Sequence, residues 1–312
     1  MKILVTGAAG MLGSALVRKF SSTEPRAEVI GFSRSDVDLS SSSALSAKLS
    51  EVQPELVIHT AAKVGGIQAN ISQPVEFLAR NLDIDRNVIL NSLEIGIPQL
   101  IYVGSSCMYP KDYRQPLHES DLLMGPLEPT NEGYALAKIV GAKLCEFASS
   151  SAPVSYRTVI PSNLYGPGDN FDPKTSHLLA SVIRKVHEAK LSRARAVEVW
   201  GSGEARREFT YIDDLAEWMV KAATKVEMLP QYLNLGFGQD YSVTDFYKAA
   251  MRVIGVQAEL VFDTTKPDGM KEKLLESGLA RESAGWDPQT TIEEGIRKTY
   301  RWYQEQHRNE KV

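Results

Sequence analysis

The chain has 312 residues, of which 43% are hydrophobic and 24% charged, and its formal net charge at pH 7 is −4. This is the composition of an ordinary globular protein that is long enough for a large core and one or two domains. A slightly acidic chain does not favour a nucleic-acid surface. No apolar run approaches the ~18 residues of a membrane span, so we expect neither a nucleic-acid nor a membrane partner.

The cysteine content is low, and it indicates the compartment. Cys107 and Cys145 have no paired spacing, and Met1 leads directly into a strand-like segment, so we expect no signal peptide. We therefore expect a reducing compartment, the cytoplasm, and no disulfide framework. We also expect no metal.

A glycine-rich segment follows the first predicted strand. Residues 2–6 form a short apolar run typical of a buried parallel strand, and residues 14–20 read as a helix. Between them lies Gly7-x-x-Gly10-x-x-Gly13. Such a turn lets the backbone approach a pyrophosphate, which the N–H groups of the helix N-terminus then bind. We expect the dinucleotide to contact Gly7, Ala9, Gly10, Met11, Leu12 and Gly13.

The tip of the second predicted strand, residues 27–32, bears on the choice of cofactor. It is followed by Ser33-Arg34-Ser35, with no carboxylate at the tip. An acidic residue there would bind the ribose 2′-hydroxyl of NAD, whereas an arginine can pair with the 2′-phosphate of NADP. Arg34 therefore favours NADP(H), although Asp36 and Asp38 follow shortly after it.

Strands and helices alternate through the first half of the chain. After the two strands above, we expect strands at residues 55–60, 99–104 and 154–160, with a long helix at 74–94. This rhythm predicts an α/β fold with a doubly wound parallel (Rossmann) sheet. Functional residues of such sheets lie beyond the carboxyl ends of the strands, which is where Ser105 follows residues 99–104.

The rhythm breaks after residue 166. We expect a helix at 176–190, short strands around a turn at 197–201 and 207–212, and a strand at 232–236. These elements predict a smaller mixed α/β substrate lobe that covers the sheet edge. We assign residues 1–166, with 210–237 returning, to the dinucleotide-binding domain, and 167–209 and 238–312 to the substrate lobe.

Tyr134 and Lys138 lie four residues apart in a predicted helix that begins near Thr130 or Asn131. They therefore share one helix face, one turn apart. A phenol titrates near ~10, and an adjacent ammonium lowers the pKa of Tyr134 toward working pH. This pair is suited to proton transfer.

Together these motifs resemble the extended short-chain dehydrogenase/reductase family. The segments Ala-Ala-Lys-Val-Gly-Gly-Ile (61–67), Gly-Ser-Ser-Cys-Met-Tyr-Pro (104–110), Pro-Thr-Asn-Glu-Gly-Tyr (129–134), Ser-His (176–177), Val-Trp-Gly-Ser-Gly (199–203), Arg-Glu-Phe (207–209) and Lys-Pro-Asp-Gly (266–269) resemble the GDP-L-fucose synthases within it. The resemblance covers essentially the whole chain. It implies an NADPH-dependent homodimer that epimerises GDP-4-keto-6-deoxy-D-mannose at C3 and C5 and reduces it at C4.

The resemblance also implies roles for particular residues. Cys107 and His177 would exchange protons at C3 and C5, Tyr134 would donate a proton at C4, and Ser105 and Lys138 would assist it. Further cofactor contacts would be Ala61, Lys138, Asn163 and His177. Further substrate contacts would be Lys185, Trp200, Arg207, Asp268 and Lys273. Two positions depart from the family pattern, because Lys185 replaces an arginine and Glu276 replaces an aspartate.

Other activities are compatible with the same motifs. One is an epimerase or reductase of another nucleotide-linked 4-keto-6-deoxy sugar or of a deoxyheptose. A second is a nucleotide-sugar 4-epimerase that retains and recycles NAD. A third, outside catalysis, is a dinucleotide-sensing regulator, which would need only the glycine turn and not Ser105, Tyr134 and Lys138.

Overall fold

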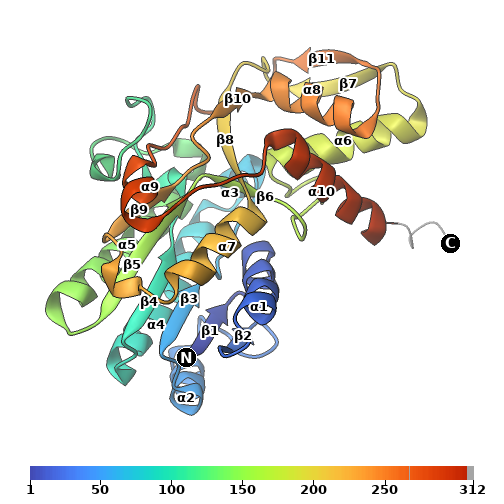
Figure 1. Ribbon diagram of the computed structural model, residues 1–312. Helices are drawn as coiled ribbons and strands as arrows, with labels where there is room; N and C mark the ends of the chain where they lie inside the picture. The colour runs from blue at the N-terminus through green and yellow to red at the C-terminus, as the bar shows by residue number, and fades with distance from the viewer. Residues whose placement is uncertain (267, 308–312) are drawn as a thin grey trace.

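The central element of the protein is a six-stranded sheet in the order β2-β1-β3-β4-β5-β9. The structure is a computed structural model that describes residues 1–266 and 268–307 (Figure 1). All five pairs of neighbouring strands are parallel, which confirms the predicted doubly wound sheet. The strands are β1 (Lys2–Thr6), β2 (Glu28–Phe32), β3 (Leu56–His59), β4 (Gln99–Val103), β5 (Ser155–Pro161) and β9 (Tyr232–Leu235).

Helices cover both faces of this sheet because its strands are apolar on both sides. In β1, Ile3 and Val5 point into one core and Leu4 into the other, as the two-residue period of a strand requires. The first core also contains side chains of α1 (Met11–Thr23), α7 (Ile212–Ala222) and α9 (Gly278–Ala284). The second contains side chains of α2 (Ser42–Val52), α4 (Pro74–Ile95) and α5 (Glu132–Ser151).

The strand order reverses between β1 and β3. From β1 the chain moves outward to the edge strand β2 and then returns to the other side of β1 as β3. Crevices at such reversal points, at the carboxyl ends of the strands, are where α/β sheets bind ligands. The glycine turn after β1 lies here, close to Ala61 after β3, because a Cβ on Gly7 would lie 2.8 Å from Ala61 Cα.

A second group of elements lies beyond the carboxyl ends of the sheet, at the top right of Figure 1. Its core joins α6 (Leu178–Ser192), α8 (Val243–Ile254) and α10 (Ile292–Gln306) with β7 (Ala196–Trp200) and β8 (Arg206–Tyr211). Strand β7 pairs in parallel with β11 (Glu259–Asp263). Strand β8 lies between β6 (Asn163–Tyr165) and β10 (Asp240–Ser242). The short helices are α3 (Ile67–Ser72) and four 3₁₀ turns: η1 (Ser106–Met108), η2 (Glu119–Asp121), η3 (Pro129–Asn131) and η4 (Val226–Met228).

The strands expected around one turn at 197–201 and 207–212 are present, but they do not pair with each other. Gly201 and Gly203 both have positive φ, at 80° and 79°, and the chain between the strands leads β7 and β8 into different sheets. Within residues 210–237, β9 joins the six-stranded sheet, and α7 packs against one face of that sheet. The division into two lobes at the boundaries given above stays a prediction.

Within residues 1–266 and 268–307, no helix is both long and apolar enough to cross a membrane. The same ranges contain no group of three or more His, Cys, Asp or Glu side chains suited to hold a metal ion.

Candidate active site

A single large cleft of about 1550 Å³ lies between the carboxyl ends of the strands and the second group of elements. It contains every residue that the sequence analysis places in a site. These are Gly7, Ala9, Gly10, Met11, Leu12, Gly13, Arg34, Ala61, Ser105, Cys107, Tyr134, Lys138, Asn163, His177, Lys185, Trp200, Arg207, Asp268 and Lys273. Pro267, part of one of the motifs, lies outside the described residues. The fold thus brings distant segments of the chain together in one cleft.

The glycine turn has no room for side chains at two of its positions. Gly7 has φ of +73°, and a Cβ on Gly13 would lie 2.1 Å from the carbonyl oxygen of Gly7. Gly10 is the N-cap of α1 and offers no side-chain acceptor to the first turn of the helix. The free N–H groups of that turn are therefore available to an anionic ligand. The turn fits the pyrophosphate of a dinucleotide.

Two carboxylates near the tip of β2 are occupied by their own loop. Asp36 accepts hydrogen bonds from the backbone N–H and hydroxyl of Ser33, at 2.8 and 2.5 Å. Asp38 accepts from the backbone N–H and hydroxyl of Ser40, at 3.0 and 2.7 Å. These bonds hold the pKa of each carboxyl below its usual range. Each aspartate is thus committed to its own loop, while Arg34 projects from the same tip into the cleft.

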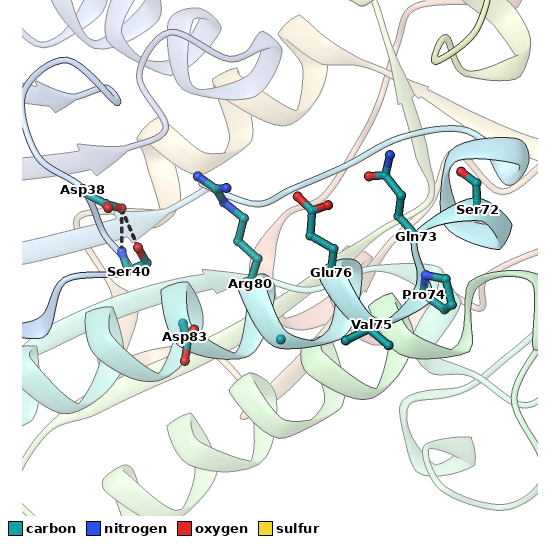
Figure 2. Close-up of a pocket in the computed structure, with 10 residues that line it drawn as sticks. Asp38, Ser40, Ser72, Gln73, Pro74, Val75, Glu76, Arg80 and Asp83 are labelled. Carbon is teal, nitrogen blue, oxygen red and sulfur yellow. Dashed lines mark hydrogen bonds between the residues drawn. The ribbon is translucent and has the colours of Figure 1, made fainter.

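Arg80 is a second arginine at this end of the cleft, and the sequence analysis does not single it out. Figure 2 shows Arg80 reaching from α4 toward the loop that carries Asp38 and Ser40. It lines both the large cleft and a side pocket of about 710 Å³ next to it. Arg80 and Arg34 both act electrostatically on Asp38. Two exposed cations therefore face the position where a dinucleotide ribose would lie.

Tyr134 and Ser105 lie at the base of the cleft. Burial raises the pKa of Tyr134 well above its ordinary value, the charges of Cys107 and Asp85 add to this, and a hydrogen bond with Ser105 opposes it. The expected lowering of this pKa by Lys138 is not what the structure shows. The Lys138 ammonium is buried and lies 3.5 Å from Asp85 Oδ2, so its charge is neutralised by a carboxylate.

Donors surround the sulfur of Cys107. The side-chain amide of Asn131 donates to Cys107 Sγ at 3.0 Å, and Lys273 Nζ lies 3.6 Å from the same atom. Asn131 Oδ1 is buried without a hydrogen-bond partner in the described structure. Lys273 lies in a loop 166 residues further along the chain than Cys107. Two donors from distant segments of the chain therefore fix the position of this sulfur in the cleft.

His177 lines the same cleft from a different element. It is the N-cap residue of α6, and burial lowers the pKa of its imidazole, so the ring is neutral at neutral pH. Asn163, the first residue of β6, also lines the cleft. Cys107 and His177 thus approach one cavity from different elements, and they offer two groups that can exchange protons.

The far end of the cleft combines an aromatic ring with cations. Trp200 is 46% exposed, and its ring lies 5.0 Å from Lys185 Nζ and 5.6 Å from Lys266 Nζ. Arg207 lies nearby; burial lowers the pKa of its guanidinium, which donates to the backbone carbonyl of Asp268 at 3.3 Å. This end suits a flat base with an attached diphosphate.

Two further residues of this end, Asp268 and Arg184, have contacts that the sequence alone does not reveal. Asp268 Oδ1 accepts from the Ser202 backbone N–H at 2.7 Å, so this carboxylate closes the turn after Trp200. Arg184, next to Lys185 on α6, lines the cleft and has a buried Nε with no partner in the described structure. Its signal in the sequence is its position beside Lys185, where the family pattern has an arginine. A planar guanidinium is thus still present on this helix.

Comparison with known proteins identifies the family. Residues 3–236 match the NAD dependent epimerase/dehydratase family. The chain belongs to this family. The resemblance inferred from its motifs is therefore confirmed.

Individual relatives extend the match over the whole chain. A GDP-L-fucose synthase from Azorhizobium caulinodans is 42% identical, with 97% of this chain and 96% of the relative covered. A GDP-L-colitose synthase from Yersinia pseudotuberculosis is 41% identical, with coverage of 99% and 100%. Among solved structures, a GDP-D-glycero-L-gluco-heptose synthase from Campylobacter jejuni, in the presence of NADPH, is 30% identical, with a TM-score of 0.89 and coverage of 97% and 98%.

Proposed function

We propose that the protein catalyses the NADPH-dependent 3,5-epimerisation and 4-reduction of GDP-4-keto-6-deoxy-D-mannose to GDP-L-fucose. The observation that carries this proposal is the presence of two proton-transfer sets in one cleft. Cys107 and His177 form one set, and Ser105, Tyr134 and Lys138 form the other. A plain dehydrogenase would need only the second set, and a regulator would need neither set. Relatives at about 40% identity over nearly the full chain support this substrate.

The cofactor is NADP(H), and the cleft fits it. The crowded turn at Gly7 and Gly13 leaves backbone N–H groups for the pyrophosphate, and Arg34 and Arg80 provide charge for a 2′-phosphate. When bound, NADPH supplies the hydride that reduces C4. Lys138 would hold the nicotinamide ribose.

The chemistry follows from the position of the ketone. Hydrogens at C3 and C5 are acidic because both carbons are adjacent to the C4 carbonyl. Inversion needs one group to remove the proton and another to deliver a proton to the opposite face, and Cys107 and His177 can act as this pair. At C4, Tyr134 would then donate its proton to the carbonyl oxygen as C4 is reduced, with Ser105 hydrogen-bonded to the same oxygen.

Binding of the nucleotide would use the far end of the cleft. The Trp200 ring would contact the guanine, while Lys185, Arg184 and Arg207 would neutralise the diphosphate. Lys273 would lie nearer the sugar, beside Cys107. Asp268 would contribute by holding the turn that carries Trp200.

A second candidate substrate deserves a direct test, because relatives of nearly equal similarity have other names. The GDP-L-colitose synthase matches at 41% identity, and the solved heptose synthase has a TM-score of 0.89. An enzyme that acts on another GDP-linked keto sugar would use the same two proton-transfer sets. Product analysis after incubation with NADPH and a panel of GDP-, UDP- and dTDP-linked 4-keto sugars would decide between the two.

We further propose that the protein works in the cytoplasm as a homodimer and binds neither nucleic acid nor a membrane. Both of its cysteines are free, which suits a reducing compartment. The helices α4 and α5 pack side by side on one face of the sheet. On α5, Leu136, Val140 and Phe147 are exposed at positions that share one helix face. A second copy of the chain would cover this apolar surface, which lies away from the cleft.

The first prediction tests the proton donor at C4. Tyr134→Phe removes the hydroxyl but keeps the ring, so we expect normal folding and NADPH binding. Reduction should fall by roughly 10²–10⁴-fold, the scale of general acid catalysis. The measurements are steady-state NADPH oxidation, thermal unfolding and NADPH fluorescence titration. Near-normal turnover in the folded variant would contradict the assignment.

The second prediction concerns cofactor preference. The wild type should have a higher kcat/KM with NADPH than with NADH. In Arg34→Ala the KM for NADPH should rise by roughly 10–150-fold, which corresponds to the loss of about 1.5–3 kcal/mol from a charged hydrogen bond, while the KM for NADH changes little. Arg80→Ala should act in the same direction. Arg26→Ala, an exposed arginine outside the cleft, is the matched control. Equal use of both cofactors by the wild type would overturn this prediction.

The third prediction separates epimerisation from reduction. In deuterated water without NADPH, the wild type and Tyr134→Phe should incorporate deuterium at C3 and C5 of the sugar, because enolisation needs no hydride. Cys107→Ala should incorporate far less at both carbons, as measured by NMR and mass spectrometry. With NADPH, its product should shift toward a GDP-6-deoxyhexose with the wrong configuration at C3 or C5.

Cys145→Ala is the matched control for this experiment, because Cys145 is fully buried on α5 and does not line the cleft. It should exchange deuterium like the wild type. Wild-type exchange at both carbons in folded Cys107→Ala would exclude the proposed role of the thiol.

The fourth prediction tests the dimer. Light scattering at micromolar concentration should give twice the 34.5 kDa mass of one chain. Phe147→Glu places a charge in the proposed interface and should give the mass of a monomer. Met228→Glu, at a residue 74% exposed on η4, is the control and should leave the dimer intact. A wild-type mass of a single chain would contradict the proposal.

A further inference from the structure

The segment that carries Lys273 has almost no regular secondary structure, yet it holds Lys273 close to Cys107. Residues 271–277, all of which the structure describes, lie between β11 and α9 and contain neither a helix nor a strand. Their one ladder contact is an isolated bridge between Leu275 and Leu117. Lys273 is nevertheless only 9% exposed, and its Nζ donates to Cys107 Sγ at 3.6 Å. A side chain on such a loop keeps one position only where other contacts fix its backbone.

One side of this segment is bonded to the chain that follows Cys107. The Leu117 N–H donates to the carbonyl oxygen of Leu274 at 2.8 Å. The Leu274 N–H in turn donates to Gln115 Oε1 at 2.9 Å. Leu274, the residue directly after Lys273, is thus bonded at both its N–H and its carbonyl to the same short stretch of chain.

The other side of the segment is bonded to Glu208, in β8. Glu208 Oε2 accepts from the Leu275 N–H at 3.0 Å, and Oε1 accepts from the Gly238 N–H at 2.6 Å. Glu208 is 1% exposed and does not line the cleft. Arg207 and Phe209, its two neighbours in the strand, both line the cleft, because successive side chains of a strand point to opposite sides. Glu208 therefore holds two loops from the side of β8 that faces away from the cleft.

The hydrogen bonds of the Glu208 carboxylate come from backbone N–H groups. Burial raises the pKa of Glu208 to about 7, while the bonds from Gly238 and Leu275 oppose this rise. A buried carboxylate is costly for folding, and here each of its two oxygens holds a different loop. The side chain is therefore suited to fix backbone positions rather than to balance a neighbouring charge.

We propose that Glu208 and Gln115 are positioning residues for proton exchange at C3 and C5: they hold the backbone that follows Lys273 and so keep Lys273 Nζ against Cys107 Sγ. Both act through Lys273. A group displaced by about 1 Å from its productive position can slow a reaction by roughly 100-fold. This inference rests on the proposed function, because that function assigns the exchange to Cys107.

The experiment uses Glu208→Gln, which keeps the size of the side chain. Its one amide oxygen replaces only one of the two acceptors, and its NH₂ group is placed against the other backbone donor. At pD 8 and saturating sugar nucleotide, deuterium incorporation at C3 and C5 should fall by about 10–100-fold. Steady-state NADPH oxidation should fall far less, because Ser105, Tyr134 and Lys138 belong to other segments.

A double-mutant cycle shows whether Glu208 acts through Lys273. Lys273→Met removes the amino group and should itself slow deuterium incorporation. If Glu208 serves to place Lys273, adding Glu208→Gln to Lys273→Met should cause no further loss. Losses that multiply in the double variant would contradict the inference. Wild-type incorporation in Lys273→Met would contradict it as well.

Asp214→Asn is the matched control. Asp214, on α7, also accepts backbone N–H groups of a distant late segment, from Gln289 at 3.1 Å and Thr290 at 2.8 Å, and it does not line the cleft. The change should lower the melting temperature without altering the ratio of deuterium incorporation to reduction. A purely structural role predicts that Glu208→Gln behaves in the same way, with both activities reduced in proportion to the folded fraction. That outcome would overturn the inference.

A second variant covers the case in which Glu208→Gln does not fold. Gln115 is half-buried, and Gln115→Met keeps the length of the side chain but removes the acceptor of the Leu274 N–H. It should lower deuterium incorporation at C3 and C5 more than it lowers reduction. An unchanged ratio of the two activities in the folded variant would contradict the inference.

A last measurement needs no substrate. Amide hydrogen exchange, followed by mass spectrometry, should be faster in peptides covering residues 272–277 of Glu208→Gln or Gln115→Met, while α5 keeps its wild-type protection. Unchanged protection of residues 272–277 would show that these side chains do not hold the segment, and the inference would fail. If the wild type acted on no GDP-linked keto sugar, the proposed function would fail instead, and the protection of residues 272–277 would still report on the hold.

Discussion

The parallel pairing of the central strands is the constraint on which the site depends. Because β1, β3, β4 and β5 run in one direction, their carboxyl ends meet at one edge of the sheet. The glycine turn begins directly after β1, and Ala61 and Ser105 are each the second residue after the end of β3 and β4. An antiparallel strand in this set would carry its following loop to the opposite edge. The sheet topology, rather than any single side chain, therefore determines where the cleft lies.

Much of this could be predicted from local sequence. The run at residues 2–6 and the turn at Gly7 to Gly13 are specified by neighbouring residues, because the strand needs apolar side chains and the turn needs glycines. Tyr134 and Lys138 share a helix face by spacing alone. These features depend on interactions within one or two turns of chain, so a pattern in the sequence is enough to identify them.

Other features could not be read from the sequence, because they arise from segments that meet only in the fold. The pairing of β7 with β11 joins residues about sixty positions apart, and nothing in either strand specifies its partner. Lys273 reaches Cys107 from the far end of the chain. Arg80 and Asp85 both lie on α4, which reads as an ordinary amphipathic helix with charged positions. Only the packing of α4 against the sheet shows that one of these charges faces the cofactor end and the other is buried.

The two proposed proton-transfer sets also differ in how the fold supports them. Tyr134, Ser105, Lys138 and Asp85 all belong to the sheet and its helices, where buried packing and a sealed ion pair fix their positions. Cys107 follows the same sheet, but His177 is the N-cap of α6 in the second group of elements, and Lys273 reaches Cys107 from a late loop. Under the proposed roles, reduction at C4 therefore uses groups that are fixed on the sheet and its helices. Proton exchange at C3 and C5 instead combines groups from both parts of the fold, so it depends on how those parts pack together.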